Sequence, residues 1–194
     1  MICKLENLPT IVKKENMNVA VISYGGCCSN TLVEVLEKNG YTCRTEIYDK
    51  ILCHCPKYVD LNIPVIYLYE NPIKALLSMK RRGKWWWDVN QQKMSNNQHV
   101  SLSNEKLLQL MIKQFHSWTN QKRHNVLIVK SEELFKIPIA NKLSFFLKKI
   151  IRGVPIQYIE PKTNLDVDSL DSDIIELFEK YKDEIDTINN FYTF

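Results

Sequence analysis

The loop that follows the first apolar run of the chain carries residue types that bind anions. Residues 19–22 have strand character, and Leu32, Val33 and Leu36 resume the apolar pattern at helical spacing. Between them, backbone N–H groups and short side chains meet the positive end of a helix, at Gly25, Gly26, Cys27, Cys28, Ser29, Asn30 and Thr31. No lysine precedes the hydroxyl residues, so this is not a Walker A loop. The pattern indicates either an anion site or an ordinary strand–helix turn whose small residues allow tight packing.

A single histidine, His54, stands between two cysteines at the end of a short apolar run. Imidazole titrates near neutral pH and can take a proton from a reacting hydroxyl, so His54 is a candidate general base. The alternative is a histidine at a strand end that hydrogen-bonds to the backbone. Cys53, His54 and Cys55 are metal-ligand types, but they lack tetrahedral spacing and a matching second pair, so we expect no metal site.

Residues 80–87 read KRRGKWWW, a run of cations followed by three tryptophans. The cations suit the C-terminus of a helix, whose dipole they complement. Trp85, Trp86 and Trp87 cannot all point inward on a helix, so at least one is expected to face a cavity or a partner. They are interpreted as core or lid aromatics, as an acceptor-binding surface, or as a stacking surface for single-stranded nucleic acid.

The elements that must position these residues alternate between strands and helices. Continuous apolar runs predict buried strands at residues 19–22, 64–69 and 125–130, and shorter runs predict two further strands within 41–47 and 50–55. Amphipathic patterns predict a helix after the first loop and four more at residues 71–83, 103–118, 139–150 and 172–188. Residues 84–102 are expected to form a polar connection, and residues 151–171 a loop.

This alternation predicts a three-layer α/β/α domain with a central parallel sheet, spanning residues 1–194 as one unit. Ligands of such sheets bind at the carboxyl ends of the strands. The first loop, the residues around His54 and the residues after Tyr69 are therefore expected to meet at one edge.

Composition narrows the classes of function. The formal net charge is +4, which is too mild for a bulk nucleic-acid binder but compatible with an anionic ligand. All six cysteines lie between Cys3 and Cys55, and neither a signal peptide nor a long apolar span is visible. We therefore expect a reduced, cytoplasmic protein with free thiols and no membrane span.

Three segments resemble signatures of one enzyme family, in the family's order. Residues 23–32 (SYGGCCSNTL) align without a gap with T-Y-P-K-S-G-T-T-W-L, and residues 70–78 (ENPIKALLS) keep the asparagine, proline and serine of R-N-P-x-D-x-x-x-S. Residues 52–56 (LCHCP) keep the histidine and proline of K-T-H-x-P, and residues 131–134 are similar to a Y-E-D-L segment. Over roughly residues 17–150 the chain thus resembles the sulfotransferases that use 3′-phosphoadenosine 5′-phosphosulfate (PAPS).

The resemblance implies a P-loop-like sulfotransferase fold and a reaction. A sulfuryl group would pass from PAPS to a hydroxyl or amine of a small-molecule or glycan acceptor, leaving 3′-phosphoadenosine 5′-phosphate (PAP). His54 would be the catalytic base, the first loop would hold the cofactor, and the tryptophans would contact the acceptor. The 3′-phosphate would be held by Ser78, with Arg81 and Arg82 as the nearest cations.

Three departures from the family pattern leave other functions open. Gly26 replaces the family's lysine, Glu70 replaces the 3′-phosphate arginine, and Thr31 replaces an adenine-stacking tryptophan. One alternative is a catalytically impaired descendant that binds a nucleotide or a protein partner. A second is a nucleic-acid-binding module that uses residues 80–87, which the mild net charge disfavours.

Overall fold

A sheet of three parallel strands forms the centre of the protein. The computed structural model describes residues 18–44, 52–95, 100–121, 123–155 and 171–191. Within these ranges the strands are β1 (Ala20–Ile22), β2 (Val65–Tyr69) and β3 (Val126–Lys130), in the order β1-β2-β3. Ala20 pairs with Val65, which pairs with Val126 on its other side. The three long apolar runs are thus confirmed as parallel strands, and the protein is of the α/β class.

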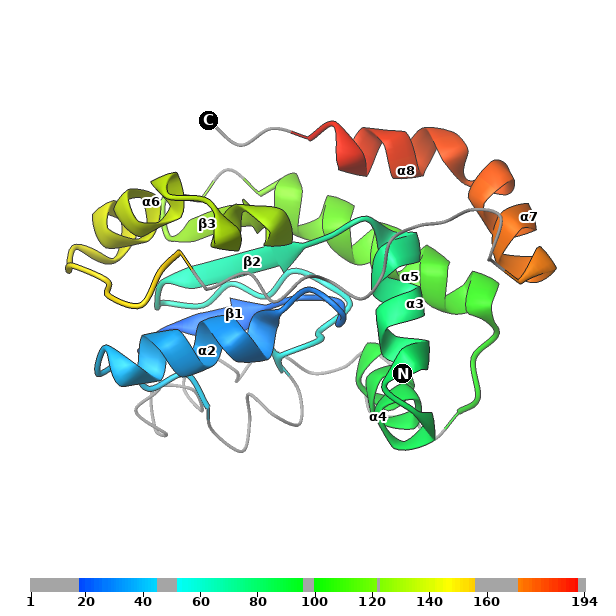
Figure 1. The fold of residues 1–194 in the computed structure, drawn as a ribbon, viewed down its shortest axis with the longest axis horizontal. Helices are drawn as coiled ribbons and strands as arrows, with labels where there is room; N and C mark the ends of the chain where they lie inside the picture. Colours follow the sequence, from blue (N-terminus) through cyan, green and yellow to red (C-terminus); the bar gives the residue numbers. More distant parts are fainter. Residues whose placement is uncertain (1–17, 45–51, 96–99, 122, 156–170, 192–194) are drawn as a thin grey trace.

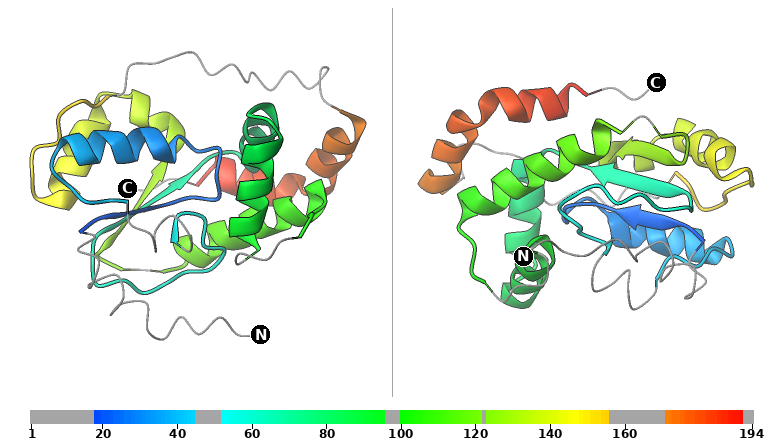
Figure 2. Two further views of the ribbon diagram at one scale, coloured as in Figure 1. Left: turned by 90° about the horizontal axis from the view of Figure 1, so that it is seen from below. Right: turned by 180° about the vertical axis from the view of Figure 1, so that it is seen from behind.

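Helices cover both faces of this sheet. Helix α2 (Ser29–Lys38) lies against one face and helix α5 (Asn104–Thr119) against the other, as Figures 1 and 2 show. From α5, Trp118 stacks on Tyr67 with ring centroids 5.6 Å apart. β1 and β2 are fully buried between the layers, whereas β3 is only partly covered.

Two consecutive helices stand beyond the carboxyl ends of the strands (Figure 1): α3 (Pro72–Arg81) and α4 (Lys84–Met94). The Asn71 side chain caps α3 by accepting hydrogen bonds from the backbone N–H groups of Ile73 and Lys74. The prediction of a polar connection over residues 84–102 is wrong for residues 84–94, which form helix α4. The hydropathy pattern of the sequence does not reveal the buried face of α4, because two of the residues buried there, Asn90 and Gln91, are polar.

The remaining elements also correct some boundaries. Residues 131–134 begin a 3-10 helix, η3 (Ser131–Phe135), and α6 (Pro138–Leu147) follows it. The predicted helix over 172–188 is two helices, α7 (Ser172–Lys180) and α8 (Lys182–Asn189), which break at Tyr181. The Tyr181 hydroxyl bonds to Glu105 and Gln109 of α5, and these contacts hold the break in place.

The two short predicted strands are wrong in the parts that the structure describes. Residues 41–44 have no regular secondary structure, residue 52 has a π-helical conformation, residues 53–54 form a turn, and residues 45–51 lie outside the described ranges. The turn is closed by a hydrogen bond from the Cys55 N–H to the Leu52 carbonyl. A backbone hydrogen bond from the Ser23 N–H to the Cys53 carbonyl joins this segment to the end of β1. In the ranges described, no helix combines the length and apolar character needed to cross a membrane.

Candidate functional site

A cavity of about 190 Å³ lies at the N-terminus of α2 and is called the loop cavity below. It brings together residues that are far apart in the sequence. Ten of the predicted site residues line it: Gly25, Gly26, Cys28, Ser29, Asn30, Thr31, His54, Arg82, Trp85 and Trp86. Cys53, Val89, Asn90 and Lys93 complete the lining.

The backbone of the first loop explains why glycines occur here. Gly25 and Gly26 have φ angles of +92° and +69°, and Cys28 has a φ of 59°. A Cβ on Gly26 would lie 2.6 Å from the carbonyl oxygen of Ala75 and 2.8 Å from its Cα. The position that carries a lysine in the sulfotransferase signature is therefore packed against the backbone of α3. A side chain here would collide with α3 before it reached a ligand.

The N-terminus of α2 faces this cavity with its backbone N–H groups. Cys28 is the N-cap residue, and its side chain makes no capping hydrogen bond. The first turn of the helix also contains no acidic residue. The donors of this turn and the helix dipole therefore favour a bound anion.

Two cations from other elements add to this positive potential. Arg82, at the C-terminal end of α3, lies with its guanidinium carbon 5.9 Å from the centre of the Trp86 ring. Lys93, on α4, places its amine 3.2 Å from the Cys53 sulfur. Among the described residues that line it, none is an aspartate or a glutamate, so this part of the lining gives the loop cavity a positive charge.

His54 is held as a neutral imidazole. Its Nδ1 lies 2.8 Å from the Ser23 carbonyl oxygen, an acceptor, so Nδ1 carries the proton and Nε2 remains available as a base. Its pKa is lowered from 6.5 to about 4, mainly because burial disfavours the charged form. Lys93 and Arg82 lower the pKa further by repelling a second positive charge.

Neither cysteine of the first loop is activated. Burial raises the pKa of Cys27 well above its ordinary value, and it also raises the pKa of Cys28. Cys27 is fully buried, and its thiol donates to the Gly25 carbonyl over 3.0 Å. A thiolate nucleophile is therefore not favoured at this loop.

Of the four lining residues that sequence reasoning did not assign to the site, Asn90 and Lys93 are the ones whose polar groups can contact a ligand. The Asn90 amide nitrogen donates to the Trp86 carbonyl over 2.7 Å, while its buried Oδ1 has no hydrogen-bond donor in the part of the chain that the structure describes. A buried acceptor without a donor costs about 1–3 kcal/mol, so this oxygen favours a ligand or water that brings a donor to it. Once residues 84–94 are treated as a helix, the spacing of Trp86, Asn90 and Lys93 places all three on one face.

Four predicted site residues do not line the loop cavity. Cys27 is in the core, Ser78 is buried in α3, and Arg81 is exposed on the same helix. Trp87 lies on a different face of α4 from Trp86. The run of three tryptophans is therefore split between two sides of one helix.

Glu70, which replaces the family's arginine, also lies outside the lining. One oxygen of its carboxylate accepts a hydrogen bond from the Asn71 N–H at 2.8 Å, and the other accepts from the Ser131 hydroxyl. Its backbone N–H donates to the buried Tyr24 hydroxyl over 2.8 Å. Glu70 therefore joins the carboxyl ends of the three strands, and its carboxylate bonds to the protein itself.

No family model matches the sequence, and no curated protein or solved structure matches the chain. Within the described residues, no group of three or more histidine, cysteine or acidic side chains is placed to hold a metal ion. Any functional assignment therefore depends on the geometry of the loop cavity.

Proposed function

We propose that this protein binds PAPS and transfers its sulfuryl group to a hydroxyl or amine of an acceptor molecule. The observation that carries the proposal is that the N-terminus of α2, two cations and a neutral histidine line one cavity, with no carboxylate among its described lining residues. Sulfuryl transfer makes demands like those of phosphoryl transfer, namely in-line positioning and stabilisation of charge on the leaving phosphate. These four features supply groups of the required kind.

In this proposal Lys93 and Arg82 take the role of the missing loop lysine. Both line the cavity, while Gly26 packs against Ala75 and has no room for a side chain. The N–H groups of the first turn of α2 would bind the 5′-phosphate, and the two cations would stabilise the negative charge that develops on it. Removal of a single such donor typically slows an enzyme by about 10²–10³-fold.

The size of the cavity suggests how the nucleotide lies. At about 190 Å³ it is smaller than the roughly 300–1,000 Å³ of ordinary small-molecule sites, so it suits the phosphosulfate end and leaves the adenosine outside. Trp85 is at the rim, and 66% of its surface is exposed. It can stack on the adenine and so replace the tryptophan that is absent at Thr31.

His54 would act as the base. Its Nε2 takes the proton of the acceptor hydroxyl as the hydroxyl oxygen bonds to sulfur, and the bond from sulfur to the phosphate oxygen breaks with its electron pair going to PAP. With a pKa of about 4, His54 is a weak base in the empty cavity. A bound phosphate would partly neutralise Lys93 and Arg82 and so remove part of the lowering of this pKa, while the larger contribution of burial would remain.

A second function is favoured by one observation: the backbone of Ala75 fills the space of the loop lysine. A descendant that binds the nucleotide without turning it over would keep the anion site and lose the need for a base. The two functions differ in turnover and agree in nucleotide binding.

A measurement of turnover distinguishes the sulfuryl-transfer function from nucleotide binding alone. PAPS is incubated with wild type and a panel of hydroxyl and amine acceptors, and release of PAP is measured. We expect His54→Asn to lower the rate by about 10²–10⁴-fold while PAP still binds. His124→Asn, which changes an exposed histidine outside the loop cavity, should leave the rate unchanged. Binding without turnover would support the non-catalytic function, and absence of binding would reject both.

A further inference from the structure

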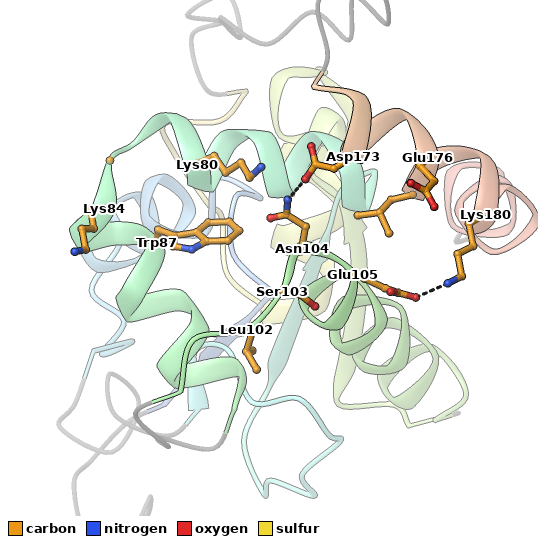
Figure 3. A pocket seen from close by; sticks show the side chains of 12 residues that line it. Lys80, Lys84, Trp87, Leu102, Ser103, Asn104, Glu105, Asp173, Glu176 and Lys180 are labelled. Carbon is orange, nitrogen blue, oxygen red and sulfur yellow. Dashed lines mark hydrogen bonds and ion pairs between the residues drawn. The ribbon is translucent and has the colours of Figure 1, made fainter.

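A second and larger cavity lies between α3, α4, the start of α5 and α7 (Figure 3). Its volume is about 690 Å³, which is within the range of small-molecule binding sites. We call it the α7 cavity. The charged and aromatic side chains that line it are Lys80, Lys84, Trp87, Glu105, Asp173, Glu176 and Lys180.

The α7 cavity is separate from the loop cavity, because the two share no lining residue. Helix α4 contributes Trp86 to the loop cavity and Trp87 to the α7 cavity. His54 lines only the loop cavity, so a ligand in the α7 cavity would not be placed for reaction with it. An inference about the α7 cavity therefore does not depend on the proposed transfer reaction.

One wall of the α7 cavity is cationic and aromatic. Lys80 of α3 and Trp87 of α4 lie side by side in Figure 3, with the Lys80 amine 6.0 Å from the centre of the Trp87 ring. Lys80 forms an ion pair with Asp171, with 4.0 Å between the Lys80 amine and the carboxylate oxygen. The Asp171 side chain is 76% exposed. An exposed pair at this distance contributes little, so Lys80 can exchange Asp171 for an anionic group of a ligand.

The opposite wall is acidic. It comes from α7 and the first turn of α5, and Figure 3 shows Glu176, Glu105 and Lys180 across the cavity from Trp87. Glu105 and Lys180 neutralise each other through an ion pair of 2.7 Å. Asp173 accepts a hydrogen bond from the Asn104 amide, which leaves its negative charge in place. Asp173 lies nearer to Lys80 in Figure 3, so the carboxylate that leaves the wall across from Trp87 with a net negative charge is that of Glu176.

We propose that the α7 cavity binds an elongated zwitterion, namely a short peptide with both ends free or a molecule of similar charge. Such a ligand places its anionic end at Lys80 and its ammonium group at Glu176, on the far side of the cavity. Its apolar body lies on Trp87 and against Leu102 and Leu177, which also line the cavity. A ligand with one charge would leave the charge of one wall without a partner, and a neutral ligand would leave the charges of both walls without partners. Because the walls face each other, the two charges must be separated along the ligand, as the ends of an extended dipeptide are at about 7 Å.

The first test uses the dipeptide phenylalanyl-alanine and two blocked forms. Binding to wild-type protein is measured by calorimetry and NMR titration near pH 6.5, where the terminal amine is protonated. The N-acetyl form lacks the positive charge, and the C-terminal amide lacks the negative charge. We expect the free dipeptide to bind about fivefold more tightly than either blocked form, the upper range for one partly exposed ion pair.

Charge variants assign each end to a wall. Lys80→Gln should weaken the free dipeptide and the N-acetyl form but not the amide, and Glu176→Gln should weaken the free dipeptide and the amide but not the N-acetyl form. Both residues lie at the surface of the fold, and Lys93→Gln in the loop cavity is the matched control that should change none of the three affinities. Equal affinity for the free and blocked forms, no binding, or preferential binding of an uncharged sugar would overturn the proposal.

Discussion

The two cavities on either side of α4 are lined by different kinds of groups. The loop cavity combines backbone features, namely a left-handed loop and a helix N-terminus, with a half-buried histidine and the exposed side chains of Arg82 and Trp85. The α7 cavity is larger, and its acidic wall consists of exposed side chains on α7. A site made of backbone is pre-organised for one group, whereas a site made of exposed side chains can change its specificity by single substitutions. The first arrangement suits a fixed chemical group such as phosphate, and the second suits a variable ligand.

The largest expected effect tests whether the loop cavity is held by backbone packing. Gly26→Ala places a Cβ 2.6 Å from the Ala75 carbonyl oxygen at a φ of +69°, so we expect it to lower the free energy of unfolding by at least about 2 kcal/mol. Gly83→Ala is the matched control, because Gly83 also has a positive φ but no atom within 4 Å of the added Cβ. Gly83→Ala should cost about 1 kcal/mol, and urea unfolding measures both. Equal losses would show that Gly26 is not packed as described.

A slightly smaller effect tests how well His54 is shielded from water. Its folded pKa of about 4 is below the unfolded value of 6.5, so the unfolded state binds more protons between these values. Stability is therefore full above pH 6.5 and falls as the pH drops toward 4, by about 2 kcal/mol between pH 7 and pH 5. His54→Asn keeps a donor near the Ser23 carbonyl and should remove this part of the pH dependence. Identical pH profiles for wild type and variant would place His54 in contact with bulk water.

The next effect concerns Glu70, which the structure assigns to neither cavity. Glu70→Arg removes both acceptors used by the Asn71 N–H and the Ser131 hydroxyl, so we expect a loss of about 1–3 kcal/mol in the free energy of unfolding. PAP affinity should not rise in the folded fraction, because the new side chain starts outside the lining of the loop cavity. Glu132→Arg, at an exposed position of η3, controls for the charge change. Tighter PAP binding in Glu70→Arg would instead bring this position into the cofactor site.

The smallest effect tests whether α4 keeps the two sites apart. Trp85→Ala should weaken PAP binding by about fivefold through the lost adenine stacking and leave phenylalanyl-alanine binding unchanged. Trp87→Ala should do the reverse. Fluorescence titrations of the two variants with both ligands measure these four affinities. A loss of both ligands in one variant would mean that the two cavities are coupled through α4.

The sheet was predictable from the sequence because its long strands are continuous apolar runs, as Val65–Tyr69 shows. The first loop and His54 were also placed at one edge by the rule that ligands bind at the carboxyl ends of strands. Helix α4 was missed because hydropathy does not reveal a helix that buries Asn90 and Gln91. Lys93 was missed with it, since a cation contributes to a site only after the helix that carries it is recognised.

The role of Glu70 was unpredictable for a different reason. Its carboxylate is bonded by Ser131, a residue 61 positions later in the sequence, and this contact exists only because β2 and β3 are adjacent. A comparison of signatures shows which residue is replaced but not what the replacement binds. The packing of Gly26 against Ala75 was hidden in the same way, because it depends on where α3 begins relative to the first loop.

The measurement that tests the central claim most directly is calorimetric titration of PAP at two salt concentrations, with wild type and the double variant Arg82→Gln/Lys93→Gln. We predict that PAP binds to wild type, that raising the salt weakens this binding, and that the double variant binds at least about tenfold more weakly because it loses both cations of the loop cavity. The double variant should keep the wild-type affinity for phenylalanyl-alanine, which shows that the fold is intact. No binding of PAP to wild type, or an affinity that the double substitution leaves unchanged, would contradict the assignment of the loop cavity as the nucleotide site.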